Sequence, residues 1–317
     1  MPSETDRMFG VDLVTFHDPA FWGVADEAGI TAVAARDPHA FWTRILDAVH
    51  QTGITGIELT FPPYSWICAV AAFGSADEFA SQLAARDLCL CSAFFADLAF
   101  APDLNDPAAV AGIIGRGAAA AGFLAAAGAD VMVVGLPMRQ TPGATPARLF
   151  DLSAASALAD IVNRLGVATA AHGVKIALHT EAHSVFAAAR DIDLMMLLTD
   201  PVFVGLCPDT AHLVLMGGDP VQIVDRHHER VLIAHWKDAT GPMPHDTPID
   251  DTIHTRHQRY FCGLGAGRVD WRAWSGLVTA RGIGGWAILE LDASADPVAD
   301  LTQGLAFARR ALTRPDR

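Results

Sequence analysis

Val174-Lys-Ile-Ala-Leu-His-Thr-Glu181 is a run of apolar residues that ends in an acidic side chain. Similar runs follow in Val202-Phe-Val-Gly-Leu-Cys-Pro-Asp209, Val231-Leu-Ile-Ala-His235 and Trp286-Ala-Ile-Leu-Glu290. Short runs of branched apolar residues bounded by Gly or Pro are typical of buried parallel strands. Because functional groups lie at the C-terminal ends of the strands in a ring of parallel strands, we expect these four end residues to converge on one site.

The rest of the chain repeats this alternation of strand and helix. Asp-Pro pairs, such as Asp106-Pro107 and Asp219-Pro220, predict an N-cap followed by the first helical turn. The predicted strands are 9–16, 57–61, 88–95, 130–135, 174–180, 202–208, 231–234 and 285–291. The predicted helices are 41–50, 76–86, 107–128, 146–172, 191–199, 220–230, 270–280 and 297–313. Eight strand-helix units with right-handed crossovers predict an α/β fold, a single (β/α)8 TIM barrel over residues 1–317.

One long irregular insertion, Asp238 to Val269, separates the seventh and eighth predicted strands. It contains several prolines, His245, His254 and His257. A loop of this length in a compact domain is a lid, a binding loop or a linker. Its Gly263-x-Gly265-x-Gly267 run is similar to a phosphate loop, but it lacks the preceding strand and the third spacing, and we interpret it as a turn.

Composition excludes several classes of protein. With 22 basic and 36 acidic residues the formal net charge is -14, and no basic run is present, so nucleic acid is not an expected partner. The five cysteines form no C-x-x-C pair, which argues against a disulfide framework or a zinc finger and favours a reducing cytoplasm. We expect no membrane span, since no leader pattern and no apolar run of about 18 residues is present, and the alanine-rich stretch 117–128 is typical of a packed helix.

The residue types at the four strand ends predict a metal site. Glu181, Asp209, His235 and Glu290 offer three carboxylates and one imidazole, a set that suits Mn²⁺ best, with Co²⁺, Mg²⁺ and Zn²⁺ as alternatives. One such residue alone is more often a hydrogen-bonding loop residue, but four at equivalent positions favour one divalent ion. Cys207 lies inside its strand and is interpreted as a packed core residue.

Three polar residues beside these ends are further candidates. His212, three residues after Asp209, is expected to contact substrate. Lys237, two residues after His235, is expected either to bind a substrate oxygen or act as an acid with a lowered pKa near the metal, or to form a salt bridge with Asp238 or another carboxylate. Glu58 is a carboxylate within an apolar strand, a costly position unless it is paired or solvated, so it is a candidate for contact with substrate or for support of the metal ligands.

Aromatic residues are abundant near the predicted strand ends. They are expected to wall a sugar site by stacking, with packing as the alternative for each one. Trp22 and Phe261 are the main candidates, and the others are Phe21, Phe61 and Trp66.

These motifs together resemble the xylose-isomerase-like sugar isomerase/epimerase superfamily, which includes ketose 3-epimerases, inosose dehydratase and endonuclease IV. The resemblance covers nearly the whole chain. It is carried by Leu178-His-Thr-Glu181, Cys207-Pro-Asp-Thr-Ala-His212 with Gly217-Gly-Asp-Pro220, His235-Trp-Lys-Asp238, Leu264-Gly-Ala-Gly-Arg-Val-Asp270 and Ile288-Leu-Glu290.

The resemblance implies a barrel with one divalent ion held by Glu181, Asp209, His235 and Glu290. It also implies that Glu181 and Glu290 are acid/base partners, while His212 and Lys237 contact substrate oxygens. Ketose 3-epimerases usually have an Arg where this chain has Gly241, and His235-x-Lys-Asp is closer to the dehydratase branch. Endonuclease IV needs further His and acidic ligands for three zinc ions, and the acidic net charge of this chain argues against a DNA-binding groove.

The predicted function is a metal-dependent isomerase or epimerase that acts on a keto-sugar through an enediolate formed by carboxylate acid/base catalysis. An alternative is a dehydratase or lyase, similar to inosose dehydratase, that expels a β-hydroxyl from the same intermediate. An alternative of another class is a non-catalytic barrel that binds a sugar or a partner. The expected partner is a small sugar or cyclitol, and family habit suggests a homo-oligomer.

Overall fold

The computed structural model of the protein describes residues 7–101, 103–139 and 150–313. Its main sheet contains eight parallel strands in the order β6-β5-β4-β3-β2-β1-β10-β7. Parallel bridges from Leu206 to Val231 and from Asp209 to His235 join the two outer strands and close the ring. The strands are β1 (Phe9–Asp12), β2 (Gly56–Leu59), β3 (Cys89–Phe95), β4 (Val131–Val134), β5 (Lys175–His179), β6 (Val204–Cys207), β7 (Ala234–Trp236) and β10 (Ala287–Leu289). The predicted TIM barrel is confirmed.

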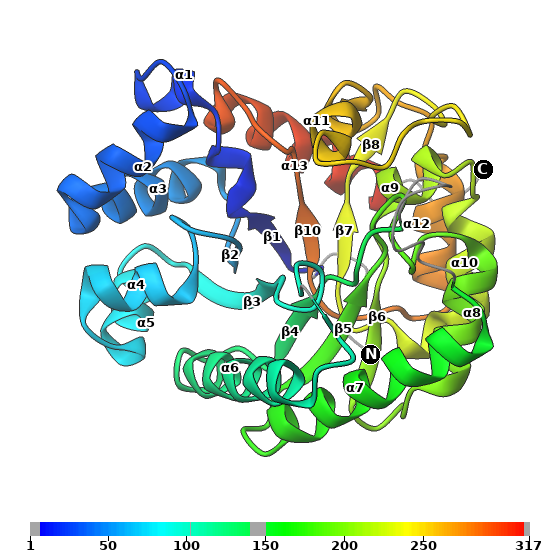
Figure 1. Cartoon of the computed structure of the whole chain (residues 1–317). Helices are drawn as coiled ribbons and strands as arrows, with labels where there is room; N and C mark the ends of the chain where they lie inside the picture. The colour runs from blue at the N-terminus through cyan, green and yellow to red at the C-terminus, as the bar shows by residue number, and fades with distance from the viewer. Residues whose placement is uncertain (1–6, 102, 140–149, 314–317) are drawn as a thin grey trace.

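Helices surround the barrel on the outside (Figure 1). In chain order they are α1 (Pro19–Trp22), α2 (Glu27–Arg36), α3 (Pro38–Thr52), α4 (Trp66–Phe73), α5 (Ala76–Ala84), α6 (Pro107–Ala126), α7 (Leu152–Ala170), α8 (Ala189–Leu198), α9 (Thr210–Leu215), α10 (Pro220–His227), α11 (Ile253–Gln258), α12 (Trp271–Ala280) and α13 (Pro297–Thr313). Short 3-10 helices occur at Leu13–Phe16 and His228–Arg230. The predicted caps are confirmed where Asp37, Asp106 and Asp219 accept hydrogen bonds from the first turns of α3, α6 and α10.

Most predicted elements differ from the structure by up to three residues at their ends, and two differ by more. The first strand stops at Asp12 because the Asp12 carboxylate accepts a hydrogen bond from the Val14 amide and starts a 3-10 helix, so the prediction of a strand to Phe16 was wrong. The helix predicted from Pro146 begins at Leu152 in the described part of the chain, after an Asp151 cap. Residues 146–149 of that prediction lie outside the described residues.

Helix α6 ends at Ala126, two residues before the end predicted for it. Within the described residues it is the helix whose length and composition would allow a membrane span, with a mean hydropathy of 1.6 in its best window. Its side chains Val110, Ile113, Ala121 and Leu124 are buried, and the helix packs on β3, β4 and α7. This packing is that of a barrel helix.

The interior of the barrel is filled by small and branched side chains. Cys91, Val133, Ala177, Cys207, Ile233 and Ile288 form a buried cluster inside the ring. The interpretation of Cys207 as a core residue is confirmed, since its side chain is fully buried. Because the interior of the barrel is packed with these apolar groups, polar chemistry is confined to the C-terminal ends of the strands.

The segment 238–269 carries more structure than expected. It contains α11 and two short antiparallel strands, β8 (Asp238–Ala239) and β9 (Phe261–Cys262). Since β8 follows β7 directly, the segment lies at the C-terminal end of the barrel (Figure 1).

One buried carboxylate organises the end of this segment. Asp238 accepts hydrogen bonds from the amides of residues 239, 265, 267 and 269 and from the Trp271 indole, at 2.8–3.1 Å. A Cβ on Gly267 would lie 2.2 Å from Asp238 Oδ1, so glycine is needed there for close approach. The glycine run is therefore a turn around a carboxylate, as predicted, and not a phosphate loop.

Candidate active site

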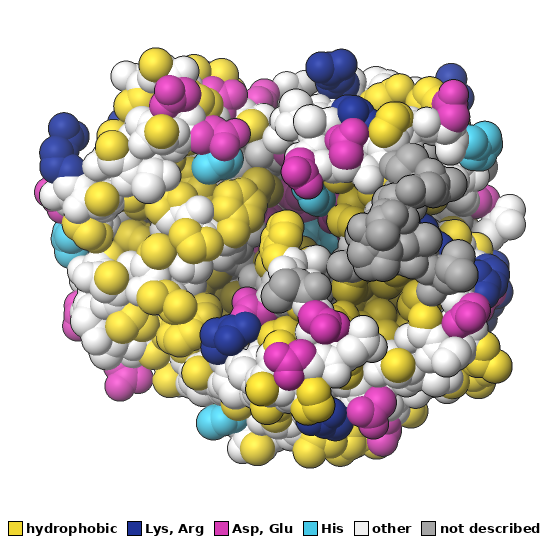
Figure 2. All heavy atoms as spheres, in the orientation of Figure 1, with side chains coloured by type: hydrophobic (Ala, Val, Ile, Leu, Met, Phe, Trp, Pro, Cys, Tyr) yellow, Lys and Arg dark blue, Asp and Glu magenta, His cyan; other side chains and the backbone are white. Residues whose placement is uncertain are grey.

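A cavity of about 370 Å³ opens at the C-terminal end of the barrel. Its lining residues come from the ends of β1, β5, β7 and β10 and from α11. Figure 2 shows a central hollow on this face, with hydrophobic side chains along one flank and acidic and histidine side chains at its depth. The volume is in the range of small-molecule sites.

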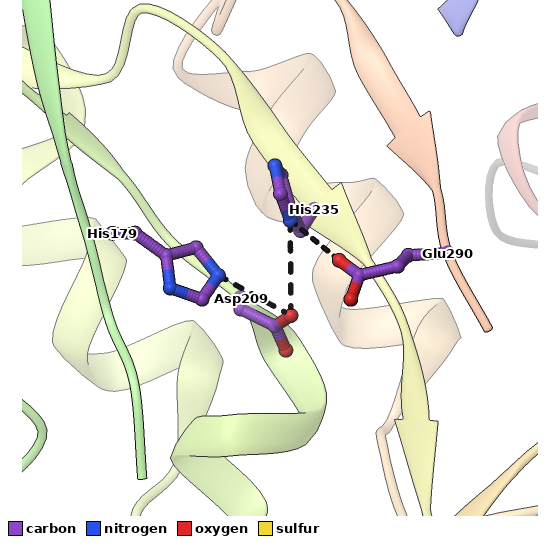
Figure 3. A group of neighbouring side chains, drawn as sticks. All are labelled: His179, Asp209, His235 and Glu290. Carbon is purple, nitrogen blue, oxygen red and sulfur yellow. Dashed lines mark hydrogen bonds and ion pairs between the residues drawn. The ribbon is translucent and has the colours of Figure 1, made fainter. Parts of the chain in front are cut away.

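Four side chains at the C-terminal ends of the strands form a candidate metal site, and three of them line the cavity (Figure 3). His179, Asp209, His235 and Glu290 each offer one ligand atom, and all four atoms lie within 4.8 Å of one another. His179 Nε2 is 3.6 Å and His235 Nδ1 is 4.0 Å from Asp209 Oδ2. His235 Nδ1 is 2.6 Å from Glu290 Oε2. The structure therefore brings together three of the four predicted ligands, and His179 completes the group.

Several buried polar atoms of this group have no hydrogen-bond partner among the described residues, as expected for atoms that bind a cation. They include Asp209 Oδ2 and both ring nitrogens of His179. Buried polar atoms are costly unless they are satisfied. A divalent ion between these atoms would satisfy them and offset the charge of the two carboxylates.

Sequence reasoning missed His179 because it stands two residues before Glu181. Both side chains project to the same side of an extended chain, and the carboxylate was the more expected ligand. In the structure β5 ends at His179, which pairs with Cys207, two residues before Asp209. The pairing of the end of β5 with β6 was the signal that could have identified His179 as a neighbour of Asp209.

Glu58 lies behind His235 and does not line the cavity. Its side chain is fully buried, and its Oε1 is 2.8 Å from His235 Nε2, on the ring edge opposite Nδ1. Ser92 donates its hydroxyl to the other oxygen of Glu58. A carboxylate on the outer nitrogen of a metal-binding histidine orients the ring, and the position of Glu58 fits this one of its two predicted roles.

Electrostatics keep the ligand groups in useful protonation states. Burial opposes the charged form of Glu290, but Lys237 and His235 lower the pKa of this carboxyl well below its usual range. Burial would also lower the pKa of His235, but Cys207, Glu58 and Glu290 raise it well above the ordinary value. A cation at His235 Nδ1 would compete with this proton.

Glu181 faces the cavity beside the four-residue group. Its Oε2 is 3.4 Å from His179 Nδ1, and its Oε1 is 3.5–3.6 Å from the Nδ1 atoms of His212, His254 and His257. Burial would raise the pKa of Glu181, but these imidazoles lower it well below the usual range. Glu181 is therefore a carboxylate, about 15% exposed, with access to a bound molecule.

His212 also lines the cavity, as its predicted contact with substrate requires. Its Nδ1 accepts a hydrogen bond from the Ala182 amide at 3.1 Å. Burial lowers the pKa of His212 to about 3, against the opposing effect of Glu181 and Asp209. His212 is therefore a neutral imidazole.

Lys237 is fully buried between two carboxylates. Its Nζ donates to Glu290 Oε1 at 2.7 Å and to Asp292 Oδ1, and it lies 3.8 Å from the centre of the Phe261 ring. Burial would lower the pKa of Lys237, but Asp292 and Glu290 raise it well above its usual value. The predicted salt bridge is present, the pKa shift is opposite to the lowered pKa expected for an acid, and the ammonium still lines the cavity. Asp292, which sequence reasoning missed, has its pKa raised to about 6, mainly by burial.

The predicted aromatic wall is only partly present. Trp22 is buried, stacks on Phe41 at 4.2 Å between centroids and donates to the Phe16 carbonyl, so it is a packing residue and its prediction as a substrate contact is not supported. Trp66 and Phe21 likewise pack on other rings. Phe61 lines the cavity, and Phe261 lies beside it under Lys237. Phe94 and Phe100 also line the cavity and were missed.

Comparison with known proteins identifies similar chains. A family model described as xylose isomerase-like TIM barrel matches residues 46–311. Inosose dehydratase of Lacticaseibacillus casei is 30% identical over 184 residues, which cover 54% of this chain and 60% of the relative. Inosose dehydratase of Geobacillus thermodenitrificans is 28% identical over 178 residues, with coverage of 54% and 60%. The chain thus matches about 60% of the length of these curated relatives.

Solved structures share the fold over nearly the whole chain. A xylose isomerase-like TIM barrel protein from Mycobacterium smegmatis in complex with magnesium has a TM-score of 0.70 at 16% identity, with 99% of each chain covered. An L-ribulose 3-epimerase has a TM-score of 0.70 at 14% identity, with coverage of 97% and 95%. An IOLI protein with a bound zinc atom has a TM-score of 0.68 at 14% identity, with 96% of each chain covered.

Proposed function

Because the chain belongs to the xylose isomerase-like TIM barrel family, we propose that it is a divalent-metal-dependent enzyme that removes the proton beside the carbonyl group of a polyhydroxylated ketone. The family match and the enzyme names of the relatives confirm the predicted class, an enzyme of this family. The observation that carries the proposed reaction is the group of buried, unpartnered ligand atoms at the C-terminal ends of the strands.

The proposed ligands are His179, Asp209, His235 and Glu290, with His179 in place of the predicted Glu181. Two imidazoles and two carboxylates suit Mn²⁺, Zn²⁺ or Co²⁺ better than Mg²⁺, and Mn²⁺ stays our first candidate. When bound, such an ion polarises a carbonyl oxygen and acidifies the neighbouring C–H group. Glu58 orients His235 for this role from behind.

Glu181 is the proposed base. It is ionised, it faces the cavity, and it is not needed as a ligand of the first ion. It accepts the proton from the carbon beside the carbonyl and can return it to that carbon or its neighbour. Glu290, predicted as its partner, has one oxygen on His235 and the other on Lys237, so its proposed role is to bind the ion and hold the lysine.

Lys237 is the proposed donor to the enediolate oxygen. Its high pKa makes the ammonium a poor proton source but a permanent hydrogen-bond donor, which stabilises negative charge that develops in a water-poor cavity. His212, a neutral imidazole, is proposed to contact a substrate hydroxyl. Phe61, Phe94 and Phe100 are proposed to pack on the apolar face of the substrate.

Return of the proton gives the predicted isomerase or epimerase. Elimination of a β-hydroxyl, as in a dehydratase, is the second candidate, and two observations favour it. Asp292 lines the cavity, and burial raises its pKa to about 6, so this carboxyl takes up a proton more readily than an exposed aspartate and is the proposed acid for the leaving hydroxyl. The curated relatives cited above are named inosose dehydratases.

The test combines metal analysis with proton exchange. The protein is loaded with Mn²⁺ and mixed in D₂O with a panel of ketoses and inososes, and deuterium uptake and dehydrated product are followed by NMR. We expect Glu181→Gln to keep the ion and lose exchange, and His179→Gln to lose the ion. His172→Gln is the control, because His172 is an exposed histidine shortly before β5 in the sequence. Full exchange by Glu181→Gln would refute its role as base. Bound metal without exchange on any ligand would favour the non-catalytic barrel.

A further inference from the structure

We propose that Glu181, His254 and His257 form a second divalent-cation site at the cavity, next to the first one. The ligand atoms of these three residues lie within 4.8 Å of one another. His254 Nδ1 is 3.6 Å and His257 Nδ1 is 3.5 Å from Glu181 Oε1. One carboxylate and two imidazoles can supply three protein ligands, with the cavity left for water.

The two histidines are presented by a short helix. His254 and His257 lie three residues apart on α11, so they share one helix face. That face lines the cavity, since both residues contribute to its wall. Helix α11 belongs to the segment 238–269, so this site combines the end of β5 with a part of the chain outside the barrel strands.

A buried nitrogen without a partner points to a ligand here. His257 is 1% exposed, and its Nδ1 has no hydrogen-bond partner among the described residues. Its other nitrogen, Nε2, lies 2.9 Å from His183 Nδ1 and is paired there. When Nε2 carries the proton of this pair, a lone pair on Nδ1 faces the Glu181 carboxylate, and a cation can lie between the nitrogen and the oxygen.

His212 is not part of the proposed set, although its Nδ1 is also 3.5 Å from Glu181 Oε1. Its Nδ1 already accepts the Ala182 amide proton. The lone pair that would bind an ion is therefore occupied.

The two sites use different atoms of adjacent residues. His179 Nε2 faces Asp209 in the first site, whereas His179 Nδ1 faces Glu181 Oε2. Glu181 Oε1 is the oxygen directed at the second site. The second site has only three protein ligands, and the His254 side chain is 50% exposed. We therefore expect it to bind more weakly than the first site and to prefer Zn²⁺ or Co²⁺ to Mg²⁺, because imidazole is a poor ligand for Mg²⁺.

One consequence rests on the proposed function: an ion on Glu181 Oε1 lowers the basicity of the carboxylate that accepts the substrate proton. Excess metal would then inhibit proton exchange, while the first equivalent activates it. Binding of the second ion itself does not depend on that reaction.

The experiment is equilibrium dialysis of metal-free protein against Zn²⁺, followed by metal analysis. We expect two equivalents in the wild type and one in His254→Ala and His257→Asn at the same free Zn²⁺. His245→Ala removes an exposed histidine of the same segment and should keep two. Loss of even an outer-shell partner weakens metal sites by about 10–100-fold, so loss of a ligand should weaken the second site by at least about 100-fold.

One equivalent in the wild type, or two of unchanged affinity in His254→Ala, would overturn the second site. His254→Ala keeps the test valid if the buried His257 variant fails to fold. Exchange assays in D₂O separate the two proposals: two equivalents without exchange on any ligand refute the proposed function alone, and one equivalent with exchange refutes the second site alone. Inhibition by excess Zn²⁺ is expected in the wild type and should require a higher Zn²⁺ concentration in His254→Ala.

Discussion

Replacement of Asp238 by alanine is expected to detach the end of the 238–269 segment from the barrel. The Asp238 carboxylate is fully buried and accepts five hydrogen bonds, four from backbone amides and one from the Trp271 indole. With the carboxylate removed, these donors lose their shared acceptor.

The size of the effect follows from the donors that stay buried. A hydrogen bond to a charged group contributes about 1.5–3 kcal/mol, and an unsatisfied buried donor costs about 1–3 kcal/mol. The amides of Gly265 and Gly267 are partly buried and can regain water, whereas the Val269 amide and the Trp271 indole are buried. We therefore expect a loss of about 4 kcal/mol, near the upper end for single substitutions. Asp238→Asn keeps one acceptor oxygen and should lose about half of that.

The free energy of unfolding in urea measures this effect, with Asp251→Ala, an exposed acidic residue of the same segment, as the control. Limited proteolysis should show faster cleavage between residues 239 and 270 in Asp238→Ala. A loss of stability below about 1 kcal/mol in Asp238→Ala, within the usual range of surface substitutions, would refute the view that this carboxylate holds the segment.

Three more predictions concern other parts of the molecule. Burial and the Asp238 carboxylate raise the pKa of Cys262 to about 11, so alkylation of its thiol should stay slow up to about pH 9 and rise towards pH 11. Asp238→Asn should move this rise to lower pH. Peptide mass spectrometry measures the alkylation, and an unshifted pH profile would contradict the effect of the carboxylate. Removal of the proposed ion with a chelator should lower the unfolding free energy by about 4 kcal/mol relative to free metal at 1,000 times its Kd, with little change in His179→Gln. Trp22→Ala should cost about 3–5 kcal/mol of stability without a change in KM, whereas Phe61→Ala should raise KM with little loss of stability; a raised KM in Trp22→Ala would place that indole back in the substrate site.

The barrel was predictable because its signals are local. Apolar runs bounded by Gly or Pro mark the strands, and Asp-Pro pairs mark several helix starts, so the order of elements follows from neighbouring residues. The end of β1 was not predictable from periodicity, because a side chain, Asp12, competes with the sheet for the Val14 amide. Helices α1 and α2 lie between the first predicted strand and the helix predicted at 41–50, and they were not predicted.

The site was predictable in part. Asp209, His235 and Glu290 directly follow or end apolar runs, and the structure brings them together. The choice between His179 and Glu181 depends on where β5 ends relative to β6, which no single run reveals. His254 and His257 were seen only as residues of an irregular insertion, although their spacing of three is that of one helix face.

The anchoring of residues 239, 265, 267, 269 and 271 by one carboxylate also bears on how this fold can diversify. Both ends of the stretch 240–264 are fixed beside each other. The chain between them therefore forms a loop whose ends keep their positions when its length changes. The entropic cost of closing a longer loop grows only with the logarithm of its length, about 0.6 kcal/mol for each doubling. An exchange of this stretch between related barrels should therefore alter the roof of the cavity, including the residues of α11, while the strand-end ligands below it keep their positions.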